Sequence, residues 1–196
     1  MNDVSARPLT RDTVVPFIED IFVRRGGEEY LGEPVTMAEH MLQGAALAEQ
    51  AGHTPEIIVA ALLHDIGHFT SEFGMFSMAD TQDKLHEEAG ARVLAPFFPS
   101  VVTDCVRYHV AAKRYLCATR PSYLARLSEA SIHSLHLQGG PMNDDEVAAF
   151  ATNPNLDAIL IIRHLDDAAK DPDVETPPFA HFAPLVRCVV AQKLDG

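Results

Sequence analysis

The chain has 196 residues, 47% of them hydrophobic, which suits one globular domain with a sizeable core. Its formal net charge is −13 and no basic cluster interrupts the acidity, which excludes nucleic acid and anionic membranes as expected partners. No segment has the pattern of a membrane span or a signal peptide, and Cys105, Cys117 and Cys188 form no CxxC pair. We therefore expect a soluble cytoplasmic protein whose cysteines stay reduced.

Helical signals follow one another along the chain, whereas strand signals are almost absent. A capping box at 36–39 predicts a helix to about residue 51, and Thr54-Pro55 starts an apolar helix that ends at His64-Asp65. Further helices are expected over 84–94, 100–112, 121–139, from 143, over 153–166 and over 180–192. These signals predict an all-α fold with seven or eight helices. We expect one domain over 1–196, with a core at about 30–170 on which the terminal segments pack.

Two stretches lack a clear period and are expected to be loops. Residues 68–83 contain Gly74 and several phenylalanines and methionines, and we expect this loop to lie over the functional site. Residues 26–34 begin with two glycines and end with a proline, so they are a second flexible candidate.

The dipeptide His64-Asp65 places two metal-liganding side chains next to each other at the end of an apolar helix. Further residues of this kind stand on helical faces that are expected to point at the core. Taken singly, each histidine is also typical of a hydrogen-bonded core residue. Together, however, buried imidazoles and carboxylates need a cation to offset their lost hydration. The candidate metal ligands are His40, His64, Asp65, His86, His109 and Asp166.

Six ligands exceed the needs of one ion, so the set predicts two metal ions that share the Asp65 carboxylate. The other ligands divide into a group of His40, His64 and Asp166 and a group of His86 and His109. Imidazole and carboxylate ligands without sulfur suit iron, manganese or zinc. The sequence therefore predicts a two-metal centre built between helices.

The order of these ligands resembles the HD-domain superfamily, whose best-known members are metal-dependent phosphohydrolases. The flanking motifs are more specific and resemble a narrow oxygenase branch of that superfamily. They are EYLGE at 29–33, EH at 39–40, LLHDIGH at 62–68, HE at 86–87, HVAAKRYL at 109–116, SEAS at 128–131, QGGPM at 138–142 and RHLD at 163–166. Members of that branch are mixed-valent diiron oxygenases that cleave the carbon–phosphorus bond of 1-hydroxy-2-aminoethylphosphonates. They release phosphate with glycine, or with glycine betaine when the amine is trimethylated.

The resemblance implies a Fe(II)/Fe(III) pair held by the six candidate ligands, with O2 as co-substrate. It also implies that Tyr30 and Glu33 form a mobile pair that covers the open iron until the substrate arrives. The residues implied to lie in the substrate pocket are His68, Lys113, Ser131, Gln138 and Arg163. The residue types agree with this chemistry, because a phosphonate dianion needs fixed cations and Lys113 and Arg163 supply them.

Two other functions share the HD fold. A phosphohydrolase would use the metal ions to activate water against a nucleotide or another phosphate ester, whereas a binding or sensor module would hold no stoichiometric metal. Within the oxygenase interpretation, the primary and the trimethylated amine both stay open, with a slight preference for the trimethylated one. Aromatic and acidic residues of the 68–83 loop would suit a quaternary ammonium, and ordinary packing is their alternative role. These residues are Phe69, Phe73, Phe76, Glu72 and Asp80.

Overall fold

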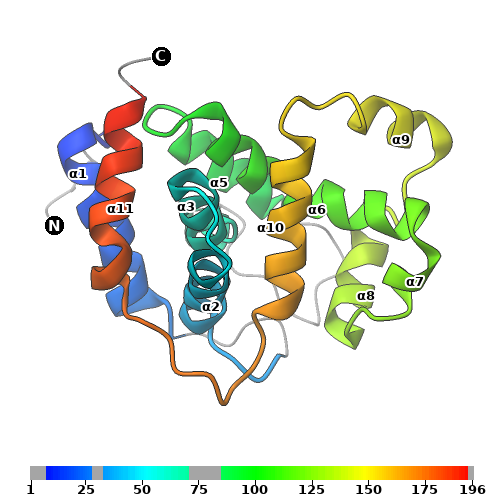
Figure 1. The fold of residues 1–196 in the computed structure, drawn as a ribbon, viewed down its shortest axis with the longest axis horizontal. Coiled ribbons are helices and arrows are strands. Elements are labelled where there is room, and N and C mark those ends of the chain that lie inside the picture. Colours follow the sequence, from blue (N-terminus) through cyan, green and yellow to red (C-terminus); the bar gives the residue numbers. More distant parts are fainter. Residues whose placement is uncertain (1–7, 28–32, 71–84, 194–196) are drawn as a thin grey trace, which may run out of the picture.

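The computed structural model describes residues 8–27, 33–70 and 85–193, and this part of the chain is helical, with no strand (Figure 1). Its elements are α1 (Arg11–Asp20), the π-helix η1 (Ile21–Arg25), α2 (Met37–Gln50), α3 (Pro55–Leu63), α4 (Gly67–Thr70), α5 (His86–Leu94), α6 (Ser100–Thr119), α7 (Pro121–Leu124), α8 (Glu129–Leu137), α9 (Asp144–Phe150), α10 (Leu156–Ala168) and α11 (Phe179–Gln192). The all-α prediction is confirmed. The expected number of seven or eight helices is wrong, because the described residues contain eleven α-helices.

Three departures from the expected elements account for the larger number. The helix α1 begins at a capping box formed by Thr10 and Thr13, a signal outside the predicted ranges. The helix expected over 121–139 is two helices, because Ser128 caps α8 by accepting the backbone N–H of Ser131 at 3.1 Å. The single turn α4 occupies the start of the expected 68–83 loop, and residues 71–84 lie outside the described part of the chain.

The helix α3 lies at the centre of the bundle because it is apolar all round, and residues 57–63 are all buried (Figure 1). The helices α2, α6, α10 and α11 all pack against it, and α6 also packs against α5 and α10. The expected end of α6 at residue 112 is seven residues too early. The last turns of α6 bury Leu116 and Cys117 in a second small apolar cluster with Tyr123 and Leu135. The helices that carry the candidate ligands are therefore direct neighbours in space.

The helices α4 and α5 approach each other so closely that only glycine fits at position 67. A β-carbon on Gly67 would lie 1.7 Å from the carbonyl oxygen of His86. We expect Gly67→Ala to displace the start of α5 and with it His86, lowering the free energy of unfolding by about 3 kcal/mol. Chemical denaturation and metal analysis of the purified variant measure the two effects.

The matched control is Gly27→Ala, because a β-carbon on Gly27 would meet nothing within 4 Å. This variant is expected to keep the stability and metal content of the unsubstituted protein. A Gly67→Ala protein that behaves like the Gly27→Ala protein would show that the close approach does not position His86.

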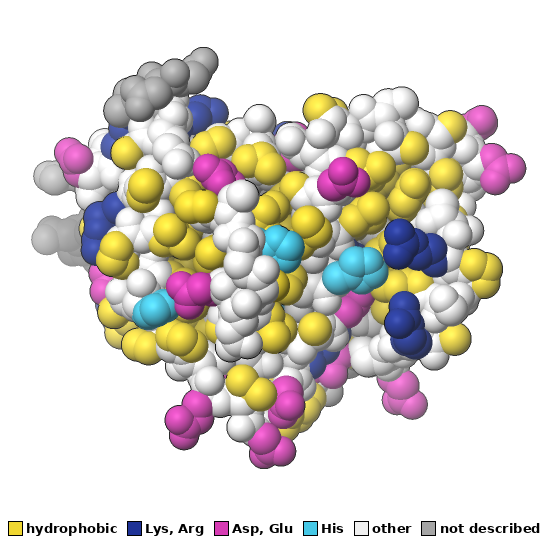
Figure 2. Space-filling model, in the orientation of Figure 1, with side chains coloured by type: hydrophobic (Ala, Val, Ile, Leu, Met, Phe, Trp, Pro, Cys, Tyr) yellow, Lys and Arg dark blue, Asp and Glu magenta, His cyan; other side chains and the backbone are white. Residues whose placement is uncertain are grey.

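On the face shown in Figure 2, acidic and basic side chains are dispersed in small groups among apolar ones. No helix of the described residues has the length and apolarity needed to cross a membrane. Cys105 and Cys117 are buried and Cys188 is exposed, and all three are free thiols.

Candidate metal centre

One half of the centre is formed by α2, the end of α3 and α10. His40 on α2 and His64, directly after α3, place their Nε2 atoms 3.0 Å apart, and both rings are buried. Asp166 on α10 lies beside them, with its Oδ1 3.4 Å from the Nε2 of His40. Its Oδ2 is 3.9 Å from the Nε2 of His64. Three residues that are distant in the sequence thus converge on one small buried volume.

The other half is formed by α4, α5 and α6. His86 is the first residue of α5 and His109 lies on α6, and their Nε2 atoms are 3.1 Å apart. The ring of His68 on α4 stacks on that of His86 with the ring centroids 4.0 Å apart. Neither ring nitrogen of His68 has a hydrogen-bond partner among the described residues. Burial, reinforced by His86, lowers the pKa of His68 well below its usual value, so this ring is neutral.

The carboxylate of Asp65 lies between the two halves. Its Oδ2 is 3.6 Å from the Nε2 of His40 and 3.4 Å from that of His64. Its Oδ1 is 3.2 Å from the Nε2 atoms of both His86 and His109. One oxygen therefore faces each half, which is the arrangement of a carboxylate that bridges two metal ions.

Hydrogen bonds on the outer side of the rings determine which nitrogen carries a proton. Nδ1 of His40 donates to the carbonyl of Ala169 at 2.7 Å. Nδ1 of His64 and Nδ1 of His109 each donate to the carbonyl three residues earlier, at 2.8 Å. In neutral rings, the unprotonated Nε2 atoms of His40 and His64 would then face each other, which is favourable only when a proton or a metal ion supplies positive charge between them.

The two carboxylates add negative charge to the same volume. Burial opposes the charge of Asp65, but the neighbouring histidines outweigh it and hold the pKa of this carboxyl well below its usual range. Burial would likewise lower the pKa of His64, but Asp65 and Asp166 outweigh it and raise this pKa to about 9. Both shifts show that the site favours a cation. The convergent imidazole and carboxylate groups, with no thiolate, fit metal ions of the iron, manganese and zinc group.

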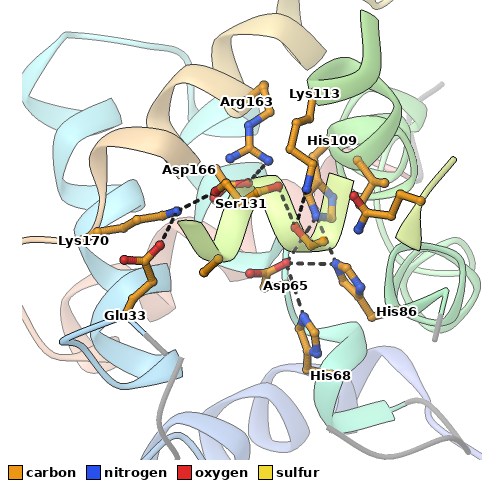
Figure 3. Close-up of a pocket in the computed structure, with 14 residues that line it drawn as sticks. Glu33, Asp65, His68, His86, His109, Lys113, Ser131, Arg163, Asp166 and Lys170 are labelled. Atoms are coloured by element: carbon orange, nitrogen blue, oxygen red, sulfur yellow. Dashed lines mark hydrogen bonds and ion pairs between the residues drawn. The ribbon is translucent and has the colours of Figure 1, made fainter. Parts of the chain in front are cut away.

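A pocket of about 30 Å³ lies next to this centre. All the residues that the sequence predicted for the substrate line it, namely His68, Lys113, Ser131, Gln138 and Arg163 (Figure 3). Glu33 lines it as well, whereas Tyr30 lies outside the described residues. The geometry thus brings the predicted substrate residues and the predicted ligands to one place.

The pocket contains buried cations close to the carboxylates. Arg163 directs one guanidinium nitrogen to Asp166 Oδ2 at 2.6 Å and the other to Asp167, which also accepts from the hydroxyl of Tyr123 at 2.5 Å. Burial opposes the charge of Arg163, but the two carboxylates outweigh it and raise its pKa. Lys113, also buried, donates to the hydroxyl of Ser134 at 2.7 Å. This side of the pocket can bind an anion.

The charge of Lys113 gives the site a testable pH dependence. Burial, reinforced by Arg163, lowers the pKa of Lys113 to about 7. We expect kcat/KM for an anionic substrate to fall as the pH rises through about 7, because the ammonium is lost. Between pH 7 and the pKa of Lys113 in the unfolded chain, the folded protein binds fewer protons at this residue than the unfolded chain does. The contribution of Lys113 to the free energy of unfolding therefore increases over this range, so unfolding does not explain the fall in kcat/KM.

A pH profile of kcat/KM between pH 5.5 and roughly pH 9 measures this effect. In Lys113→Arg the cation persists to much higher pH, and we expect the alkaline limb to move upward. An unchanged limb in that variant would assign it to another group.

Sequence reasoning missed two polar residues that line the pocket, Ser134 and Lys170. Helical spacing was an available signal for Ser134 alone. Ser134 lies one turn after Ser131, and Lys170 lies seven residues after Arg163, the spacing of two helical turns. Lys170, however, comes after the end of α10, where helical spacing no longer predicts direction.

The expected aromatic surroundings of the amine are only partly within the described residues. Phe69 is buried and does not line the pocket; the guanidinium of Arg25 lies 5.4 Å from its ring centroid. For Phe69, therefore, the alternative role in packing applies. The other candidates of this loop, Phe73, Phe76, Glu72 and Asp80, lie outside the described residues.

Comparison with known proteins places this geometry in context. The family model of the HD domain matches residues 37–139, which include the first five candidate ligands but not Asp166. A relative from Leisingera caerulea is 68% identical over the full length of both chains. It is named [1-hydroxy-2-(trimethylamino)ethyl]phosphonate dioxygenase (glycine-betaine-forming).

Two more distant relatives also align with most of the chain. A hydroxymethylphosphonate dioxygenase from Gimesia maris is 44% identical over 80% of this chain and 78% of its own length. An uncharacterized protein of Acanthamoeba polyphaga mimivirus is 35% identical over 78% of this chain and 71% of its own. Both named relatives are thus dioxygenases of hydroxylated phosphonates.

Proposed function

The chain belongs to the HD-domain family, and we propose that within it this protein cleaves the carbon–phosphorus bond of [1-hydroxy-2-(trimethylamino)ethyl]phosphonate with O2. The observation that carries this proposal is the 68% identity to such an enzyme over the full length of both chains. The products are phosphate and glycine betaine. The carbon that bears the hydroxyl loses four electrons and becomes a carboxylate, O2 accepts them, and one proton is released, so no external reductant is needed.

We propose that the centre holds two iron ions, with Asp65 as the shared ligand. When bound, the ions would polarise the substrate oxygens and would provide the redox chemistry needed to react with O2. The other ligands are His40, His64 and Asp166 for one ion and His86 and His109 for the other. The support for this assignment is the convergence of the four histidine Nε2 atoms on the two oxygens of Asp65, with Asp166 beside His40 and His64.

The protein side chains bind and orient the substrate beside this centre. Lys113 and Arg163 provide positive charge for the phosphonate, and Ser131 adds a hydroxyl donor. Asp167 keeps the guanidinium of Arg163 fixed, so this cation is oriented before the substrate arrives. His68 has a neutral ring, which offers one N–H donor and one acceptor nitrogen. Gln138 offers a buried amide oxygen that has no hydrogen-bond partner among the described residues.

The test of the proposal is an assay of phosphate release and O2 uptake by the iron-loaded enzyme. The trimethylated substrate, its primary-amine analogue and hydroxymethylphosphonate are compared side by side. We expect equal amounts of phosphate and consumed O2, with the highest kcat/KM for the trimethylated substrate. A higher kcat/KM for the primary amine would move the assignment to the glycine-forming reaction.

The phosphohydrolase alternative shares the ligand set but finds no support in the relatives, because both named ones are dioxygenases. The two functions differ in their need for oxygen. Anaerobic turnover of a phosphate ester, together with inertness toward all three hydroxyphosphonates, would establish the phosphohydrolase instead.

A further inference from the structure

Lys170 reaches the pocket from the segment that follows α10. Its ammonium nitrogen lies 3.1 Å from Oε1 of Glu33 and 3.2 Å from the hydroxyl oxygen of Ser131. The side chain is 15% exposed, so it stands on the outer side of the pocket, whereas Lys113 and Arg163 are buried deeper. Figure 3 shows Lys170 and Glu33 directed toward each other beside Ser131.

The backbone on both sides of Lys170 is held by side chains of α2. The carbonyl of Ala169 accepts from Nδ1 of His40 at 2.7 Å. The amide of Gln43, itself buried, donates to the carbonyl of Asp171 at 2.7 Å and accepts from its N–H at 3.1 Å. These three bonds fix the segment that carries Lys170 to the helix that carries His40. The position of the ammonium is therefore built into the same framework as the metal centre.

The contact with Ser131 places Lys170 at the phosphonate end of the pocket. A hydroxyl can accept from an ammonium and donate to an anion at the same time. An anion that accepts from Ser131 would thus lie beside the ammonium of Lys170. Arg163 already shares its charge with the carboxylates of Asp166 and Asp167, so a dianion there gains from a further cation.

Entry of the substrate also requires movement at this side. The pocket volume of about 30 Å³ is room for roughly two water molecules. A phosphonate with two carbons is much larger, so side chains at the exposed edge must shift to admit it. Glu33 and Lys170 form an ion pair at that edge, with exposed fractions of 12% and 15%.

We propose that Lys170 is a third phosphonate-binding cation of this site. Its ammonium is paired with Glu33 until the phosphonate binds and replaces Glu33 as its partner. The inference rests on the proposed function, because it takes the phosphonate as the anion. It adds a substrate-binding residue that lies beyond the HD-domain match at 37–139. Glu33, by pairing with Lys170, competes with the phosphonate for the same charge.

The test measures equilibrium binding of methylphosphonate, which lacks the hydroxyl and amine groups, to the iron-loaded enzyme by calorimetry. We expect Lys170→Gln to weaken binding by about 10- to 100-fold, as for the loss of one charged hydrogen bond. Lys170→Arg is expected to recover part of the affinity because it keeps the charge. The control is Lys193→Gln, since Lys193 is exposed after α11, and it should bind like the unsubstituted protein.

A double-substitution cycle tests the restraint by Glu33. We expect Glu33→Gln to strengthen methylphosphonate binding several-fold, and this gain should disappear when Lys170 is also glutamine. Full iron content and an unchanged melting temperature in Lys170→Gln would separate loss of binding from loss of structure. In that variant, kcat/KM for the natural substrate should fall more than kcat.

The outcomes separate this inference from the proposed function. Unaltered methylphosphonate affinity in Lys170→Gln would overturn the role of Lys170, even where the enzyme cleaves hydroxyphosphonates as proposed. Absence of a gain in Glu33→Gln would overturn the competition between Glu33 and the phosphonate. Failure of the unsubstituted enzyme to cleave any hydroxyphosphonate would instead reject the proposed function.

Discussion

Replacement of Asp65 by asparagine is expected to lower turnover by at least about 1000-fold, equivalent to roughly 4 kcal/mol of activation free energy. Asp65 is 2% exposed and directs one oxygen to each half of the centre, at 3.2–3.6 Å from the four histidine Nε2 atoms. Asparagine keeps the shape but replaces one oxygen with an NH2 group, which cannot act as a ligand. Residue 65 would then offer an oxygen donor to only one half of the centre and could not bridge the two ions, so the variant is expected to hold at most one metal ion per chain.

Metal analysis and the phosphate-release assay on the same preparation measure this result. The matched control is Asp157→Asn, since Asp157 is an exposed aspartate on α10, the helix that also carries Asp166. The control should retain the metal and most of the activity. An Asp65→Asn enzyme with two metal ions per chain and full turnover would disprove the bridging role.

Removal of the metal by a chelator is expected to abolish turnover and to lower the melting temperature by about 10 °C. The facing imidazoles and the carboxylates of Asp65 and Asp166 are buried, and their mutual repulsion is relieved by bound cations. A ligand present at about 1000 times its Kd stabilises the folded state by roughly 4 kcal/mol. For a chain of this length, that corresponds to a shift of about 10 °C.

Differential scanning calorimetry before and after chelation measures the shift, and reconstitution separates structure from chemistry. We expect Fe(II) with air to restore both the melting temperature and the turnover. Zn(II) has no redox chemistry, so it should restore the melting temperature alone. A zinc-loaded enzyme that turns over the phosphonate would contradict an oxygenase mechanism, and an unshifted melting temperature after complete chelation would contradict the buried-cation argument.

Most of the candidate centre was predictable from the sequence because its signals are local. The adjacency of His64 and Asp65 at the end of an apolar helix is visible in a few residues, and the inward helical faces that carry His40 and His109 follow from spacing. Caps such as Thr36 with Glu39 depend on residues three positions apart, so the start of α2 was predicted correctly. The division of the ligands into two groups around Asp65 agrees with the distances that the structure contains.

The helix boundaries that were predicted wrongly depend on contacts between residues that are distant in the sequence. The continuation of α6 beyond residue 112 buries Leu116 against residues of α7 and α8. The separation of α7 from α8 follows from the hydroxyl of Ser128, which caps α8 and also donates to Glu33 at 2.6 Å, 95 residues away. Capping propensity alone does not reveal which of several serines will be used.

The amino-acid sequence by itself determined the helical class and the candidate metal ligands, because these depend on residue type and on spacing within a helix, and its resemblance to the oxygenase branch supplied the cations expected for a phosphonate. Only the tertiary structure decided that Lys170 joins them. Its direction is determined by bonds from His40 and Gln43 to the backbone on either side of it, across about 130 residues of chain. Such bonds form where α2 and the end of α10 meet, and that meeting is a property of the packed core.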